Sequence, residues 1–222
     1  MRIVITGAGG ALGRAVVQAF ADRGDAVTAI VRREVAGLPL AVRQIAAGDL
    51  NDPAGARSAL DAAAAALGGG IDALIHLVGG FEWSTVEQSR PELWRQLFSD
   101  NVETTLGTIQ AALPWIGDGG AILCVGAASA QPAGAGMAPY ATAKSGVARI
   151  VEALAAELKP RNIRVNAILP AIIDTPRNRA DMPDADSSDW TSPAAIADVA
   201  LFLASAQARA ISGALIPVTH NG

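Results

Sequence analysis

The stretch Arg2-Ile-Val-Ile-Thr-Gly-Ala-Gly-Gly-Ala-Leu-Gly13 decides the fold of this chain. Residues 2–6 are typical of a buried strand, and residues 12–23, followed by Gly24, predict a helix. Glycines between a strand and a helix let backbone amides approach a pyrophosphate, and the helix N-terminus favours its negative charge. The stretch therefore predicts a dinucleotide site rather than a plain tight turn, formed by Gly7, Gly10, Ala11, Leu12 and Gly13.

Strands and helices alternate along the rest of the chain, which predicts right-handed βαβ units and an α/β fold. We expect one domain over residues 1–222, with a doubly wound, Rossmann-like parallel sheet and helices on both faces. The further strands are expected at 26–31, 73–78, 121–125, 164–169 and 214–218, and the further helices at 54–67, 91–116, 140–158 and 193–205. The polar, proline-containing segment at about 174–192 is the expected substrate loop.

Composition excludes several classes of function. The net charge is -4 and no basic stretch is long enough to follow a phosphate backbone, so we expect no nucleic acid partner. No apolar run approaches the roughly 20 residues that span a bilayer, and the first strand leaves no room for a signal peptide. We therefore expect a cytoplasmic protein without a membrane partner. The lone Cys124 excludes an internal disulfide, and no cluster has metal-ligand spacing.

Tyr140 and Lys144 lie four residues apart on an expected helix and therefore share one face. A phenol with a pKa of about 10 is a poor base at neutral pH, but a nearby ammonium lowers that pKa. Such a pair suits proton transfer at a carbonyl or imine while a hydride moves. The spacing alone is common in surface pairs, although Tyr140 is the chain's single tyrosine.

The end of the second strand bears on the choice of dinucleotide. Arg32 and Arg33 favour the 2′-phosphate of NADP(H) over the ribose hydroxyls of NAD(H), unless both are simply solvated charges. Glu34 leaves the choice less clear, because it can pair with an arginine or approach the ribose. Asp49, which precedes Leu50, can contact the adenine ring or cap the following helix.

These pieces, taken with Asp100-Asn-Val102, Asn166-Ala-Ile-Leu-Pro170 and Ser212-Gly213, resemble the short-chain dehydrogenase/reductase family over nearly the whole chain. The resemblance implies hydride transfer between NAD(P)H and a small-molecule substrate. It makes Tyr140 the acid/base, lets Lys144 lower its pKa and hold the nicotinamide ribose, and puts Asn101 beside a proton-relay water. It implies a homodimer or homotetramer packed through helices 91–116 and 140–158. Further cofactor contacts would come from Asp49, Leu50, Val78, Gly79, Gly80, Pro170, Ile172, Ile173 and Thr175.

Departures from the family pattern narrow the expectation. Ala127 stands thirteen residues before Tyr140, where the family has a catalytic serine, and Ser129 is offset by two on an expected extended strand end. Without that hydroxyl, Tyr140 must polarise the substrate alone, or the substrate must be intrinsically electrophilic. A quinonoid dihydropterin fits the second case, and Gly79-Gly-Phe81 together with residues 169–191 resembles the dihydropteridine reductase branch. A reductase of another small ketone and a catalytically impaired sensor or scaffold remain alternatives.

Several other residues have two interpretations. Phe81, Ala127 and Ser129 are the expected substrate contacts, although Phe81 and Trp83 can instead anchor their loop. His76, in place of the first asparagine of the family's Asn-Asn-Ala-Gly, is expected to pack or bond to the backbone rather than contact the cofactor. Trp94 and Phe98 indicate core or subunit interface, and Arg177 and Arg179 are either anion ligands or solvated charges.

Overall fold

The computed structural model describes residues 1–220 and contains a seven-stranded parallel sheet in the order β3-β2-β1-β4-β5-β6-β7. The strand order reverses between β1 and β4, which is the switch point where open α/β sheets bind ligands. The strands are β1 (Arg2–Thr6), β2 (Ala26–Val31), β3 (Arg43–Ala46), β4 (Ile71–His76), β5 (Ile116–Val125), β6 (Arg164–Pro170) and β7 (Leu215–Val218).

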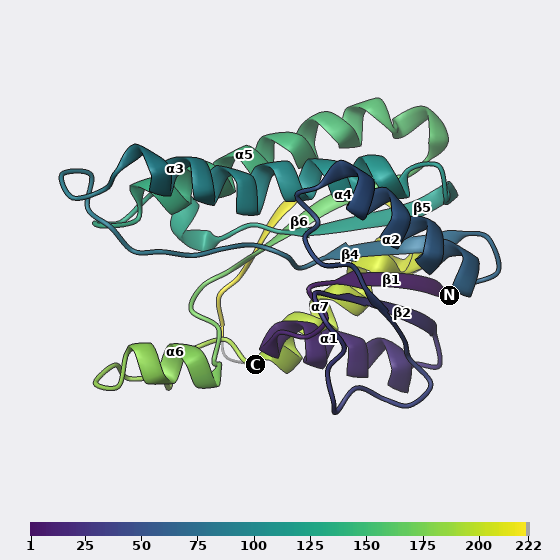
Figure 1. Ribbon diagram of the computed structural model, residues 1–222, viewed down its shortest axis with the longest axis horizontal. Coiled ribbons are helices and arrows are strands. Elements are labelled where there is room, and N and C mark those ends of the chain that lie inside the picture. The colour runs from purple at the N-terminus through teal and green to yellow at the C-terminus, as the bar shows by residue number, and fades with distance from the viewer. Residues whose placement is uncertain (221–222) are drawn as a thin grey trace.

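Helices cover both faces of this sheet, as expected for a doubly wound fold (Figure 1). One face carries α1 (Ala11–Asp22) and α7 (Pro193–Ala204), and the other carries α2 (Pro53–Ala66), α4 (Thr104–Ala112) and α5 (Ala138–Glu157). Two short helices, α3 (Pro91–Phe98) and α6 (Pro176–Asp181), lie at the end of the sheet where the strands have their carboxyl ends (Figure 1). Within residues 1–220, no helix is long and apolar enough to cross a membrane.

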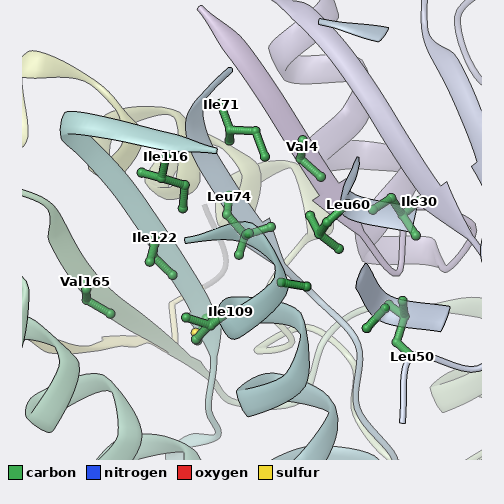
Figure 2. Packing of buried hydrophobic residues seen from close by; sticks show 14 of the residues in the cluster. Val4, Ile30, Leu50, Leu60, Ile71, Leu74, Ile109, Ile116, Ile122 and Val165 are labelled. Atoms are coloured by element: carbon green, nitrogen blue, oxygen red, sulfur yellow. The ribbon is translucent and has the colours of Figure 1, made fainter. Parts of the chain in front are cut away.

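Alternate residues of each central strand pack into separate cores on the two faces. Val4, Leu74 and Ile122 face α2 and α4, and Ile109 on α4 packs in the same core (Figure 2). The intervening Ile75 belongs to the core under α1 and α7. Because both faces are buried, the central strands are almost continuously apolar, which is why they were visible in the sequence.

The helix expected over residues 91–116 is found from Pro91, but it ends at Ala112 and is not α-helical throughout. The helix is divided into α3, a π-helical turn at Ser99–Glu103, and α4, which ends at Ala112. Pro114 lacks the N–H that would continue the helix. Ile116 instead begins β5 and pairs with Ile71, so β5 is longer than the expected 121–125.

Three other expectations about elements are corrected. The third strand, β3, was missed because Arg43-Gln-Ile-Ala46 is an edge strand with no apolar run. Strand β4 begins at Ile71, directly after the glycines, and stops before the expected end at residue 78. The expected loop at 174–192 contains α6, whose N-terminus Thr175 caps by accepting from the Asn178 N–H at 3.1 Å.

Candidate active site

The glycine turn after β1 forms a tight cradle at the switch point. Gly7 has φ +67°, and a Cβ there would lie 2.9 Å from the carbonyl carbon of Leu77. A Cβ on Gly13 would overlap the Gly7 oxygen and the Ala8 backbone. Gly10 precedes α1 and donates its N–H to the Gly7 oxygen at 3.1 Å. The turn therefore holds the N-terminus of α1 against β1 and fits a pyrophosphate, with Ala11 exposed and Leu12 half-buried on its first turn.

Arg14 is a residue of this region that the sequence reasoning missed. Its Nε donates to the Gly9 oxygen at 3.2 Å and its Nη1 to the Ala36 oxygen at 2.6 Å. Arg14 thus braces the glycine turn against the loop that carries Arg32 and Arg33, both of which are exposed. Because Arg14 directly follows Gly13, the sequence could have predicted that its side chain contacts the glycine turn.

The loop after β3 is held by its own hydrogen bonds. Asp49 is exposed and accepts from the Asn51 N–H at 2.9 Å, while Asp52 caps α2. The alternative that Asp49 caps the following helix is therefore wrong. Leu50 is buried in the core beneath α2 and α4, although it was expected at the cofactor.

Tyr140 and Lys144 occupy the first two turns of α5 and share one face, as their spacing predicts. The Lys144 Nζ lies 5.9 Å from the centroid of the Tyr140 ring and donates to the Val125 oxygen, at the end of β5, at 2.9 Å. Lys144 is buried and Tyr140 is half-buried. The end of β5 therefore fixes the ammonium beside the phenol.

Burial decides the protonation of this pair. It raises the pKa of Tyr140 to about 12 and lowers the pKa of Lys144 to about 8. The expected lowering of the phenol's pKa is not found, because burial is the cause that shifts it. At neutral pH the phenol therefore keeps its proton and is suited to donate it.

Asn101 lies in the π-helical turn and is completely buried. Its Nδ2 donates to the Leu97 oxygen at 2.8 Å and to the Gly80 oxygen at 3.1 Å. The backbone carbonyl of Asn101 accepts from Thr105 Oγ1. A Cβ on Gly79 would lie 2.6 Å from Asn101 Oδ1 and 2.9 Å from Lys144 Nζ. The structure thus brings Gly79, Asn101 and Lys144 together, as expected from the sequence.

His76 ends β4 beneath this group. It is fully buried, and its Nδ1 lies 2.9 Å from Thr6 Oγ1, so it bonds a side chain rather than the backbone. Burial, followed by the charge of Lys144, lowers the pKa of His76 to about 3. The ring is therefore neutral at physiological pH.

The expected substrate residues lie around Tyr140. The Phe81 ring stands at 87° to the Tyr140 ring, with centroids 4.9 Å apart, and is 59% exposed. Ala127 is buried with extended backbone. Ser129 is not on a strand end, because β5 stops at Val125 and Ser129 lies in the 3₁₀ turn Ala128–Ala130. Trp83 anchors its loop by donating to the Ala135 oxygen at 3.2 Å.

The segment after β6 is tied to the sheet at both ends. Ile173 forms a parallel bridge with Thr191, and the nearby Trp190 is buried. Arg179 pairs with Asp174 at 2.6 Å and Arg177 pairs with Asp181 at 3.3 Å, so both arginines are surface charges with acidic partners. The expected cofactor residues here lie along the start of the segment, from the buried Pro170 through the exposed Ile172 to Thr175.

The remaining aromatic pair on α3 is not part of the core. Trp94 is half-buried and donates to Ser89 Oγ at 2.9 Å, whereas Phe98 is 48% exposed.

Val78 and Gly80 continue the chain from β4 toward Phe81. Gly80 approaches Asp100, because a Cβ on Gly80 would lie 2.7 Å from Asp100 Oδ2.

A parallel sheet with a glycine turn at its switch point and a tyrosine–lysine pair beside it defines an oxidoreductase that uses a nicotinamide dinucleotide. A family model described as enoyl-(acyl carrier protein) reductase matches residues 7–220, and the chain belongs to the short-chain dehydrogenase/reductase family.

Known proteins support this assignment. The chain is 30% identical to L-rhamnose 1-dehydrogenase (NAD(P)(+)) of Azotobacter vinelandii, over 97% of this chain and 94% of that protein. It is 34% identical to 1,2-dihydroxy-1,2-dihydronaphthalene dehydrogenase of a Ralstonia species, over 76% and 68%. Among solved structures, a blue fluorescent protein from a metagenomic library, in complex with NADPH, is 27% identical with a TM-score of 0.86, over 99% and 97%.

Proposed function

We propose that this enzyme reduces a small carbonyl, imine or quinonoid compound with NADPH, using Tyr140 as the proton donor. The observation that carries the proposal is the Tyr140 ring 5.9 Å from the buried Lys144 ammonium, which lies next to Gly79. Burial raises the pKa of the phenol to about 12, so the phenol keeps its proton at neutral pH. The relatives named above act on a sugar and a cyclic diol, so they support hydride chemistry at small oxygenated compounds and give a pteridine no support.

The residues present fit the cofactor. When bound, NADPH supplies a hydride from its nicotinamide ring. The cradle of Gly7, Gly10 and Gly13 would hold the pyrophosphate at the N-terminus of α1. The exposed Arg32 and Arg33 would pair with the 2′-phosphate. As the family resemblance implies, Thr175 would meet the nicotinamide carboxamide and Lys144 would hold the nicotinamide ribose. Further cofactor contacts would come from Val78, Gly79, Ile172 and Ile173.

The proton balance follows from the two pKa values. As the carbonyl carbon takes up the hydride that bound NADPH would supply, the Tyr140 hydroxyl gives its proton to the oxygen, which leaves an alcohol and a tyrosinate. Lys144 is charged at neutral pH, because its pKa of about 8 still lies above 7, and its ammonium stabilises the tyrosinate. Asn101 Oδ1 lies beside Lys144 across Gly79, and this free acceptor would hold a water that returns the proton.

The surroundings of Tyr140 favour an apolar, ring-containing substrate. Ala127 gives the substrate oxygen no hydroxyl donor, so either Tyr140 polarises the substrate alone or the substrate is intrinsically electrophilic. Phe81 offers a half-exposed aromatic ring next to the phenol, and Ile172 is also exposed. A second candidate is oxidation of a cyclic diol, which the Ralstonia relative favours by its name.

The test is a parallel assay of NADPH and NADH oxidation with a quinonoid dihydropterin, cyclic ketones and an acyclic ketone. The reverse reaction is assayed with cyclic diols and NADP⁺. We expect turnover of a ring-containing substrate with NADPH, abolished in Tyr140→Phe. If the protein binds NADPH but is inert with every substrate in both directions, the sensor alternative replaces this proposal.

We also propose that the enzyme is a homodimer or homotetramer. Phe98 on α3 and Leu106 on α4 are 48% and 42% exposed, and these helices lie beside α5 in the layer that the resemblance makes an interface (Figure 1). Light scattering coupled to gel filtration measures the mass directly. A monomer at micromolar concentration would contradict the proposal.

A further inference from the structure

Two of the buried polar atoms that lack a hydrogen-bond partner belong to His76 and Asn101, near Lys144. Among residues 1–220, four buried side-chain atoms accept and donate no hydrogen bond: Thr28 Oγ1, His76 Nε2, Asn101 Oδ1 and Thr108 Oγ1. Thr28 lies on β2, whereas the other three lie on β4, the π-helical turn and α4. Because such atoms are rare and costly in native proteins, a group of them indicates an unassigned interaction.

His76 has one defined partner and one free nitrogen. The register of the sheet sets it between Thr6 on β1 and Cys124 on β5, and its Nδ1 pairs with Thr6 Oγ1 at 2.9 Å. Since burial keeps the ring neutral, it carries one N–H. Whether that hydrogen lies on Nδ1 or Nε2 decides whether the free nitrogen accepts or donates.

Lys144 favours the tautomer in which Nε2 accepts. Its Nζ is held at the oxygen of Val125, the residue after Cys124, which lies opposite His76 in the sheet, and an ammonium has three donors and no acceptor. One of these donors goes to the Val125 oxygen. Asn101 Oδ1, beside Lys144 across Gly79, is a second free acceptor. One ammonium with unused donors thus lies among two acceptors with no donor.

We propose that His76 is a positioning residue for Lys144: its Nδ1–H donates to Thr6, and its bare Nε2, together with Asn101 Oδ1, holds a buried water against the ammonium. Two acceptors and one donor meet the two to four polar partners that a buried water needs. The inference rests on the proposed role of Lys144 beside Tyr140. It also gives a purpose to the histidine that stands where the family has asparagine.

The expected consequence is a higher pKa for Lys144 than burial alone would leave, because acceptors favour the charged amine. Of the other ionisable groups, Cys124 also raises the pKa of Lys144, but only when its thiol is ionised. Cys124 and Tyr140 are neutral at pH 7, since burial raises the pKa of each to about 12. Asp100 lies behind Gly80, and both of its carboxylate oxygens accept from Gln96 Nε2 at 2.9 Å.

The first test measures the tautomer in the unmodified protein. His76 and His220 are the only histidines, so ¹⁵N-histidine labelling gives two readily distinguished ring systems. We expect His76 to carry its hydrogen on Nδ1 and a bare Nε2 from pH 6 to pH 9. A hydrogen on Nε2 would overturn the proposal, and this arm requires no variant to fold.

The second test follows Lys144 itself. Lys144 and Lys159 are the chain's two lysines, so ¹³C-lysine labelling resolves both, and the exposed Lys159 is an internal reference. His76→Leu should lower the pKa of Lys144 by about one unit, and His76→Asn, whose amide can accept, should restore most of it. Thr28→Val, which removes an unpartnered buried hydroxyl from the same core face, should leave Lys144 unchanged.

Two outcomes separate this inference from the proposed function. If Lys144 titrates alike in the unmodified protein and in His76→Leu, His76 only packs and the inference fails. If the titrations shift as expected while no substrate turns over, the water site stands and the reductase proposal fails. In an active enzyme, the alkaline limb of kcat should move to lower pH in His76→Leu, together with the Lys144 titration.

Discussion

The rings of Phe81 and Tyr140 stand almost perpendicular, at 87°, with centroids 4.9 Å apart. Phe81 comes from the loop after β4, whereas Tyr140 begins α5, so two elements far apart in the sequence meet at the reacting phenol. Trp83 holds this loop to the segment before α5 through its bond to the Ala135 oxygen. Phe81 is thus an exposed aromatic surface in a fixed position beside the proton donor.

Phe81→Ala should raise KM for cyclic ketones about three- to tenfold and change kcat little. Stacking against an aromatic ring contributes ~0.5–1.5 kcal/mol beyond the buried area, and this binding is made equally in the ground state and the transition state. Steady-state kinetics with a cyclic and an acyclic ketone measure the effect. Equal changes for both ketones would show that Phe81 supports the loop and not the substrate.

Tyr140→Phe should lower kcat at least about 100-fold, because the variant removes the only hydroxyl proposed to protonate the substrate. The ring is retained, so packing against Phe81 and the fold are preserved. Fluorescence titration should show unchanged NADPH binding, and circular dichroism should show an unchanged spectrum. A loss of less than about threefold would reject Tyr140 as the proton donor.

Arg32→Ala and Arg33→Ala should each raise KM for NADPH and leave KM for NADH unchanged. The increase should be about tenfold for the arginine that contacts the 2′-phosphate directly and smaller for the other. Both side chains are exposed, so the fold should not be affected. Arg209→Ala is a matched control, because this exposed arginine lies near Arg164 at the start of β6, away from the glycine turn. Parallel losses with NADH would contradict a specific phosphate contact.

The sequence predicted the parts of the site that depend on local order. The glycine turn between β1 and α1 and the Tyr140–Lys144 spacing on α5 are both found as expected. The missed parts depend on tertiary contacts. The π-helical turn at Ser99–Glu103 consists of residues compatible with an ordinary helix, and nothing local marks it. The bond from Thr6 to His76 exists because β1 pairs with β4, seventy residues further along the chain.

Burial of neutral His76 should make the protein less stable in mild acid. Its pKa is about 3 in the folded state and about 6.5 in the unfolded chain, so between these values only the unfolded chain binds the proton. Stability is therefore complete above pH 6.5 and falls as the pH decreases, by about 2 kcal/mol from pH 7 to pH 5.

Urea denaturation at pH 7 and pH 5 measures this loss. His76→Asn has no titrating group at this position, so its free energy of unfolding should fall about 2 kcal/mol less over the same interval. Thr28→Val is the control for a change in core packing and should retain the pH dependence of the unmodified protein. The same loss in His76→Asn would assign the acid sensitivity to other groups.

Ala127→Ser tests the idea that the substrate needs no second donor. Ala127 is 5% exposed with extended backbone, and the substitution adds one oxygen. Activity on an already polarised quinonoid substrate should stay within about threefold, whereas activity on a plain ketone should rise, because a new donor helps only where polarisation limits the rate. Ala128→Ser, one residue on in the 3₁₀ turn, is the matched control and should change neither activity. Complete loss of activity in Ala127→Ser would show that the small side chain of Ala127 is required for steric room. The absence of a serine at this position would then give no reason to expect an electrophilic substrate.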